Sequence, residues 1–302
     1  MKISWHYWCG IKNHPIRYVK YLLISIDSLI NVGNVNPKDI YVTIDNSLLK
    51  SNYGEIIKNF GVNILEAPTY PNYSKQIGYY NLLRSDTLRN DIDKLVQIDC
   101  DTIITDLNIL DKISSLKGCV NIDPSGHLNL YETIIHRDGQ KQKGNMNFSM
   151  SPLNENPPHS GDPIRYSCFK DLLNLVYNVN LDELLEKSKG EMLPIGFCYV
   201  FSPKELPKEF FKFLSFFNFF FEDDETGLAF AKFYFNLQYS DMNSDHINRN
   251  SDKNIIFNAS TSNCFNNLKG VVHFPNKDEE IDEEMSQRAN SIMNNNIRKL
   301  QK

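Results

Sequence analysis

Short apolar segments alternate with segments of helical periodicity through the first hundred residues. The expected strands cover residues 2–8, 39–45, 62–66 and the apolar run that ends at Asp99. The expected helices cover residues 15–32, 48–60 and 74–89, and Gly61 is expected to stop the second of them. Strands that alternate with helices imply parallel pairing through right-handed crossovers. This half of the chain therefore predicts a Rossmann-type α/β arrangement.

The pattern changes after residue 118. The expected strands here cover residues 119–123, 192–202, 255–257 and 270–275, and the expected helices cover residues 164–177, 181–187, 205–218, 222–237 and 278–302. A polar segment at 137–163 reads as a long loop, and loops of that length are usually functional or disordered. Gly196 falls inside the strand expected at 192–202, where a glycine admits a close ligand or a bulge.

Two aspartates, Asp99 and Asp101, follow the apolar run at 94–98. Side chains two residues apart in an extended segment point to the same side, so both carboxylates can face one point. Converging carboxylates repel each other unless a cation or hydrogen-bond donors neutralise them. Magnesium and manganese prefer such oxygen ligands, often together with substrate phosphates. The pair alone is equally typical of a metal-bridged diphosphate and of a helix cap or turn.

The end of the first strand carries aromatic residues, Tyr7 and Trp8. In open α/β sheets, ligands bind beyond the carboxyl ends of the strands, where the strand order reverses. If the first strand lies beside the fourth, these rings form an aromatic wall next to the two aspartates, which would suit a nucleotide. The alternative is that Trp5 and Trp8 belong to the core.

Composition narrows the class of protein. The 302 residues include 19 Phe and 15 Tyr, so the chain can bury a large core, and the net charge of -5 argues against nucleic acid as the main partner. The six cysteines form no Cys-x-x-Cys pair, which suggests neither a zinc site nor a disulfide framework. Residues 1–12 lack the apolar core of a signal peptide, and no uncharged stretch is long enough to span a bilayer. We expect a soluble protein of the cytoplasm.

Three further features have ordinary structural explanations. His273 ends a compact strand, and a lone histidine there is more often a hydrogen-bonded core residue than a ligand. The acidic run at 222–225 complements the dipole of the helix that it opens. The phenylalanines between residues 210 and 221 favour a domain core over a membrane-surface patch.

Taken together, these pieces give the chain a resemblance to a known family. They are Ser25-Ile26-Asp27-Ser28-Leu29, Asp99-Cys100-Asp101-Thr102, the strand with Gly196, Asp224-Glu225 at a helix start and Val272-His273-Phe274. In this order, they resemble the GT-A nucleotide-sugar glycosyltransferases, most closely the glycogenin-like retaining enzymes of family 8. The resemblance implies a mixed, mostly parallel central sheet flanked by helices. It implies one catalytic domain at 1–275, with a nucleotide-sugar half at 1–125, an acceptor half at 126–275 and a C-terminal helix at 276–302.

The resemblance also implies roles for individual residues. Asp99, Asp101 and His273 would hold a manganese or magnesium ion on the donor diphosphate. Asp224 and Glu225 fall where an Asp-Gln pair reaches the transferred sugar, with Glu in place of Gln here. The family also has a basic residue that contacts the donor, on the helix before the metal motif. The matching position in this sequence is Leu82, so the role is assigned to Arg84, two residues further along.

The activity implied is transfer of a hexose, with retention, from a UDP-sugar to a glycan, glycolipid or protein acceptor. The acceptor would bind the variable segments at 126–165 and 238–268. This activity is also compatible with peripheral contact between the protein and a membrane. Two alternatives stay open. A sugar-phosphate nucleotidyltransferase would share the half-domain and the metal, but it usually has a glycine-rich phosphate loop, and residues 8–12 contain only Gly10. A degenerate transferase would bind a sugar nucleotide or a glycan as an interaction module.

Overall fold

A computed structural model of the chain describes most of its length. The described residues are 1–9, 15–67, 83, 86–122, 126–131, 163–217, 224–242, 256–258, 271–273 and 279–300. Arg84, most of the helix expected at 74–89 and nearly all of the loop expected at 137–163 lie outside them.

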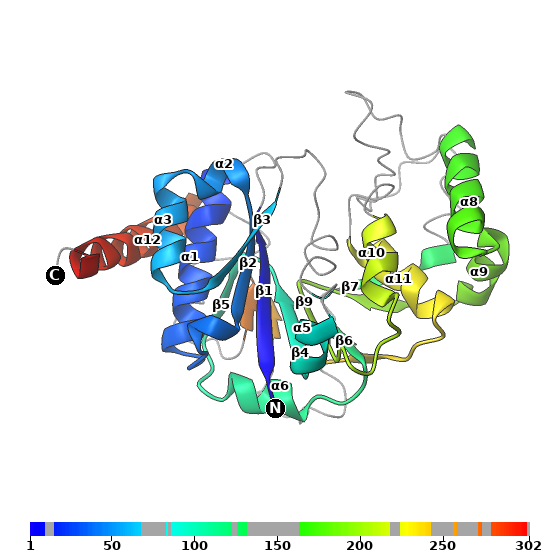
Figure 1. Ribbon diagram of the computed structural model, residues 1–302, viewed down its shortest axis with the longest axis horizontal. Helices are drawn as coiled ribbons and strands as arrows, with labels where there is room; N and C mark the ends of the chain where they lie inside the picture. The colour runs from blue at the N-terminus through cyan, green and yellow to red at the C-terminus, as the bar shows by residue number, and fades with distance from the viewer. Residues whose placement is uncertain are drawn as a thin grey trace.

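Strands and helices alternate along the described chain (Figure 1). The strands are β1 (Ile3–Cys9), β2 (Ile40–Asp45), β3 (Asn63–Ala67), β4 (Lys94–Ile98), β5 (Thr102–Ile104), β6 (Val120–Ile122), β7 (Gly126–Leu128), β8 (Leu193–Ile195), β9 (Cys198–Phe201), β10 (Tyr239–Asp241), β11 (Ile256–Asn258) and β12 (Val271–His273). The helices are η1 (Pro37–Asp39), α1 (Pro15–Asn31), α2 (Asn46–Leu49), α3 (Asn52–Asn59), α5 (Asp86–Asp91), α6 (Ile109–Ser115), α8 (Pro163–Tyr177), α9 (Leu181–Ser188), α10 (Phe210–Phe217), α11 (Asp224–Tyr234) and α12 (Glu279–Leu300).

Seven strands form the central sheet, in the order β10-β6-β9-β4-β1-β2-β3. The pairs β1–β2, β2–β3, β1–β4 and β6–β10 are parallel, while β9 is antiparallel to both β4 and β6. The expected α/β class with a mixed, mostly parallel sheet is therefore confirmed. The first strand lies beside the fourth, which was the condition for placing the end of β1 next to the two aspartates. Two smaller sheets accompany it, β11-β12-β5 and β7-β8.

Helices cover both faces of the central sheet, and each face has its own hydrophobic core. Alternation along β4 divides the side chains, because Val96 packs in the core that includes α1 whereas Leu95 packs in the core that includes α9, α10 and α11. Figure 1 shows α1 and α3 on one side of the sheet and the α8–α11 group on the other. The expected arrangement of a central sheet flanked by helices follows from strands that are apolar on both faces.

The C-terminal segment forms the expected helix, α12 (Glu279–Leu300), and the structure packs it against α1. Met285 and Ala289 are buried against Tyr21 and Ile24 of α1. Figure 1 shows α12 running from this contact to the C-terminus on the α1 side of the sheet. Among the described residues, none of the helices has both the length and the apolar character to cross a membrane.

Two expected helices begin or end at different residues in the structure. The helix expected at 48–60 is divided into α2 and α3, because Ser51 precedes α3 and its hydroxyl donates to the Leu48 carbonyl at 2.5 Å. Gly61, with a φ of 75°, follows α3 as expected. The helix expected at 205–218 begins only at Phe210, because Pro207 disfavours helical backbone before it. The Arg89 guanidinium donates to the carbonyl of Lys208 at 2.8 Å and so holds the preceding loop.

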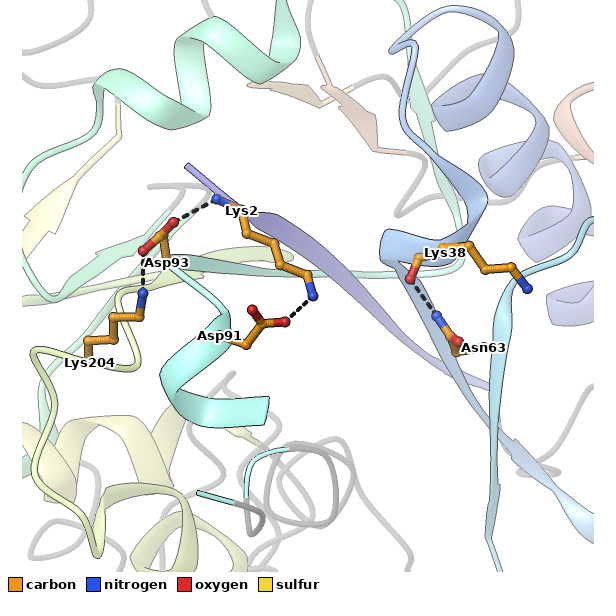
Figure 2. A network of polar contacts seen from close by, with 6 residues as sticks. All are labelled: Lys2, Lys38, Asn63, Asp91, Asp93 and Lys204. Atoms are coloured by element: carbon orange, nitrogen blue, oxygen red, sulfur yellow. Dashed lines mark hydrogen bonds and ion pairs between the residues drawn. The ribbon is translucent and has the colours of Figure 1, made fainter. Parts of the chain in front are cut away.

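Charged residues tie together the amino ends of β1 and β4 (Figure 2). The Lys2 backbone N–H donates to Asp93 at 2.6 Å, and the Lys2 ammonium pairs with Asp91. Asp93 also pairs with Lys204 at 2.5 Å, and this hydrogen bond lowers the pKa of the Asp93 carboxyl. On β3, which β2 separates from β1, Asn63 donates to the Lys38 carbonyl at 2.6 Å. These contacts fix the end of the sheet at which β1 and β4 begin, opposite their carboxyl ends.

A buried polar trio lies in the middle of the central sheet. His6 on β1 contacts Gln97 on β4 through Nδ1. Its Nε2 atom lies 2.7 Å from the hydroxyl oxygen of Thr43 on β2. The contacting atom of Gln97 is its carbonyl oxygen, which only accepts, so His6 carries its proton on Nδ1 and accepts the Thr43 hydroxyl on Nε2. Burial lowers the pKa of His6 to about 4, and the histidine is neutral in the folded protein.

This histidine makes stability depend on pH. The unfolded chain binds a proton near pH 6.5, whereas the folded protein excludes it until about pH 4. The contribution of His6 is therefore complete above pH 6.5, and it falls by about 3 kcal/mol as the pH drops through this window. Urea unfolding of the wild type and of His6→Gln between pH 4 and pH 6.5 measures this contribution to the free energy of unfolding. We expect a shallower loss of stability in H6Q, and equal pH slopes for the two proteins would contradict the assignment.

Candidate metal and donor site

The two aspartates of the sequence motif lie at the carboxyl end of β4. Asp99 follows this strand and Asp101 precedes β5, so the residues form a turn and not the continuous extended segment that the sequence predicts. Cys100, between them, donates through Sγ to the carbonyl of Trp8 at 2.9 Å. This hydrogen bond joins the end of β1 to the turn, as expected if the first and fourth strands end at one place.

Two further hydrogen bonds hold the backbone of Asp99. Its N–H donates to the carbonyl of Phe197 at 3.2 Å, and its own carbonyl accepts the Thr102 hydroxyl at 2.7 Å. Thr102 in turn contacts Ser25 at 3.1 Å. A turn whose donors and acceptors are paired in this way keeps the two carboxylates in a defined arrangement.

His273 joins the aspartates because β12 pairs with β5. The strands are antiparallel, with His273 opposite Thr102, the residue after Asp101. The His273 Nε2 atom lies 3.5 Å from Oδ1 of Asp101 and 3.9 Å from Oδ2 of Asp99. One ligand atom from each of the three residues lies within 4.8 Å of the others.

These three side chains have the chemistry of a divalent cation site. Asp101 is buried, and Asp99 and His273 are half-buried. Two carboxylates this close repel each other in a partly dry environment, and a bound cation removes the repulsion. Two hard oxygen ligands fit Mg²⁺ or Mn²⁺, and the imidazole nitrogen is more compatible with Mn²⁺ than with Mg²⁺. The residues present therefore fit the ion that the sequence leads us to expect, although its identity stays a prediction.

Tyr7 lies in the core and not on an exposed aromatic wall. Its ring is fully buried, and its hydroxyl contacts Ser25 at 2.7 Å. Since the Thr102 hydroxyl donates to Asp99, the directions of donation run from Tyr7 to Ser25, from Ser25 to Thr102 and from Thr102 to the Asp99 carbonyl. This corrects the expectation that Tyr7 packs against a base, because β1 turns this side chain towards α1. Trp8, at the end of the strand, is half-buried, and its contact with a base stays a prediction.

Gly196 lies at a break between two strands and not inside one. The apolar run at 192–202 is divided into β8, which pairs with β7, and β9, which pairs with β4 and β6. The correction has a topological cause, since one run of residues serves two different sheets. The break places the carbonyl of Phe197 beside Asp99, so Gly196 lies one residue from a contact with the candidate site.

The expected sugar-contacting residues begin α11. Asp224 is its first residue, and Glu225 is half-buried. Their contact with a transferred sugar stays a prediction, and so does a donor contact from Arg84, which lies outside the described residues. The residue that the sequence reasoning missed is Phe197. Its place in an apolar run gave no signal that it contacts the site.

Comparison with known proteins gives matches among solved structures alone. The chain matches no family model and no curated protein. The bifunctional glycosyltransferase WbbM is 14% identical over 95% of this chain and 49% of its own, with a TM-score of 0.48. The galactosyltransferase LgtC, solved with donor and acceptor sugar analogues, is 13% identical over 96% of both chains, with a TM-score of 0.41.

A third match belongs to another class of enzyme. The 4-diphosphocytidyl-2C-methyl-D-erythritol synthase of Anaerococcus prevotii is 12% identical over 79% of this chain and 87% of its own, with a TM-score of 0.40. The chain spans about half the length of WbbM. At these levels of similarity, the matches assign neither a family nor an activity to the chain.

Proposed function

We propose that the chain is a metal-dependent glycosyltransferase of the GT-A type, which moves a hexose from a UDP-sugar to a glycan, glycolipid or protein acceptor with retention. The observation that carries the proposal is the convergence of Asp99, Asp101 and His273 at the carboxyl end of β4. The strand order reverses there, since β1 has β2 on one side and β4 on the other. Open α/β sheets bind ligands at this point.

The chemistry follows from the charge of the leaving group. Sugar transfer releases a nucleoside diphosphate, and a divalent cation supplies a Lewis acid that stabilises the negative charge developing on it. Asp99 and Asp101 would hold that ion through their carboxylates and His273 through Nε2. Trp8 would pack against the base. Asp224 would orient the sugar hydroxyls or stabilise the oxocarbenium-like centre, with Glu225 beside it.

The experiment that tests the proposal is a thermal-shift screen of UDP- and GDP-sugars, with and without Mn²⁺. A ligand that binds only the native state adds about 2.7 kcal/mol of stability at a concentration 100 times its Kd. We expect one donor to raise the Tm in the presence of Mn²⁺ and the rise to vanish with a chelator. The free sugar and the sugar phosphate serve as controls, since both lack the nucleoside diphosphate.

Two other results would redirect the assignment. Release of pyrophosphate from a nucleoside triphosphate and a sugar phosphate would identify a nucleotidyltransferase. Binding of a sugar nucleotide without hydrolysis or transfer would identify an interaction module. The absence of any shift with sugar nucleotides, in protein shown to be folded by circular dichroism, would contradict the proposed transferase.

A further inference from the structure

Phe197 contacts the candidate metal group from a third segment of the chain. Asp99 and Asp101 belong to the turn between β4 and β5, and His273 belongs to β12. Phe197 comes from the break between β8 and β9, and the residue is only 3% exposed. It is therefore a core residue by burial, although it lies beside the candidate metal group.

The ring of Phe197 stacks on the imidazole of His273. The two ring centroids are 4.0 Å apart, and the ring planes differ by 26°. An imidazole that binds a metal through Nε2 must keep its plane in line with the ion, and rotation about the side-chain bonds would turn Nε2 away. A flat ring packed against one face restricts this rotation, whereas an aliphatic side chain of similar volume fills the space with less restraint on the plane.

The backbone of Phe197 acts on a second member of the group. Its carbonyl accepts the N–H of Asp99 at 3.2 Å. The residue is itself fixed, because β9 begins at the next position and pairs with β4 on one side and β6 on the other. One buried residue thus connects the aspartate turn and the histidine strand to the central sheet.

We propose that Phe197 is a positioning residue for the metal group, which holds the His273 imidazole by its ring and the Asp99 backbone by its carbonyl. The inference rests on the proposed function, since both require Asp99, Asp101 and His273 to bind a divalent cation. Residues that orient metal ligands typically change metal affinity by about 10- to 100-fold when they are replaced.

The test compares Mn²⁺ binding by the full chain and by two matched variants. Phe197→Leu removes the ring and keeps the carbonyl and most of the apolar volume. Phe201→Leu makes the same change at the end of β9, where the ring is fully buried and contacts Phe210 and Phe211. Titration with Mn²⁺ alone, followed by the electron paramagnetic resonance signal of the free ion, gives each Kd. Chemical unfolding in the absence of metal measures separately how much each substitution changes the stability of the fold.

We expect F197L to weaken Mn²⁺ binding about 10-fold or more and F201L to bind as the wild type does while losing stability. Phe197→Met provides a second ring-free variant if F197L does not fold, with the same expected result. Equal Kd values for the wild type and the ring-free variants would overturn the inference and leave the proposed function standing. Equal weakening by F201L would also overturn it. A wild type that does not bind Mn²⁺ would overturn both.

Discussion

Replacing Asp101 by Asn is expected to lower the rate of sugar transfer by at least about 100-fold and to leave the fold intact. The change removes one anionic oxygen ligand and keeps the shape of the side chain. Asp101 is only 5% exposed, so water compensates poorly for the lost charge. Initial rates with saturating donor and Mn²⁺ measure the effect, and circular dichroism verifies the fold.

The matched control for D101N is Asp111→Asn. Asp111 lies on α6, a few residues further along the chain, and is exposed. This variant loses the same charge at a position outside the candidate site, so we expect it to transfer sugar at the wild-type rate. Full activity in folded D101N would show that the metal group is assigned wrongly.

Replacing Phe213 by Ala is expected to lower the free energy of unfolding by about 3–5 kcal/mol. The side chain is fully buried on α10. Its ring stacks on Tyr234 at 4.6 Å between centroids and meets Tyr177 edge-on at 4.9 Å, so its loss leaves a cavity between three helices. Chemical denaturation, followed by near- and far-UV circular dichroism, measures the change.

An exposed position on the neighbouring α8 provides the comparison for Phe213. Leu175 is 81% exposed, and Leu175→Ala is expected to change stability by no more than about 0.5 kcal/mol. If F213A were as stable as L175A, the aromatic cluster would not be the packed core that the ring geometry describes.

Local patterns were enough to predict the first four strands and the position of the aspartates. β1 to β4 are apolar runs between helical segments, so their parallel pairing could be predicted, whereas the position of β1 beside β4 entered only as a condition. Asp99 and Asp101 are adjacent to one of these runs, so the carboxyl end of β4 could be identified as a candidate site. The turn between β4 and β5 was not predicted, because the apolar residues resume after Asp101 as they would in one strand.

Long-range pairing accounts for what the sequence did not predict. A lone histidine at a strand end is common in cores, and His273 became a candidate only through the family resemblance. In the structure, it reaches the aspartates through the antiparallel pairing of β12 with β5, which no local period encodes. The edge strand β10 and the division of 192–202 between two sheets have the same origin, as does the stacking of Phe197 on His273.

The pairing of β12 with β5 also bears on the order in which the site is assembled during synthesis. The ribosome completes the aspartate turn early, whereas the histidine is made only after β9 and α11 have emerged. A nascent chain can therefore form the sheet core and the carboxylate pair before it has the third side chain of the group. If the chain binds an ion and a donor as proposed, we expect it to acquire that ability late, when β12 docks against β5.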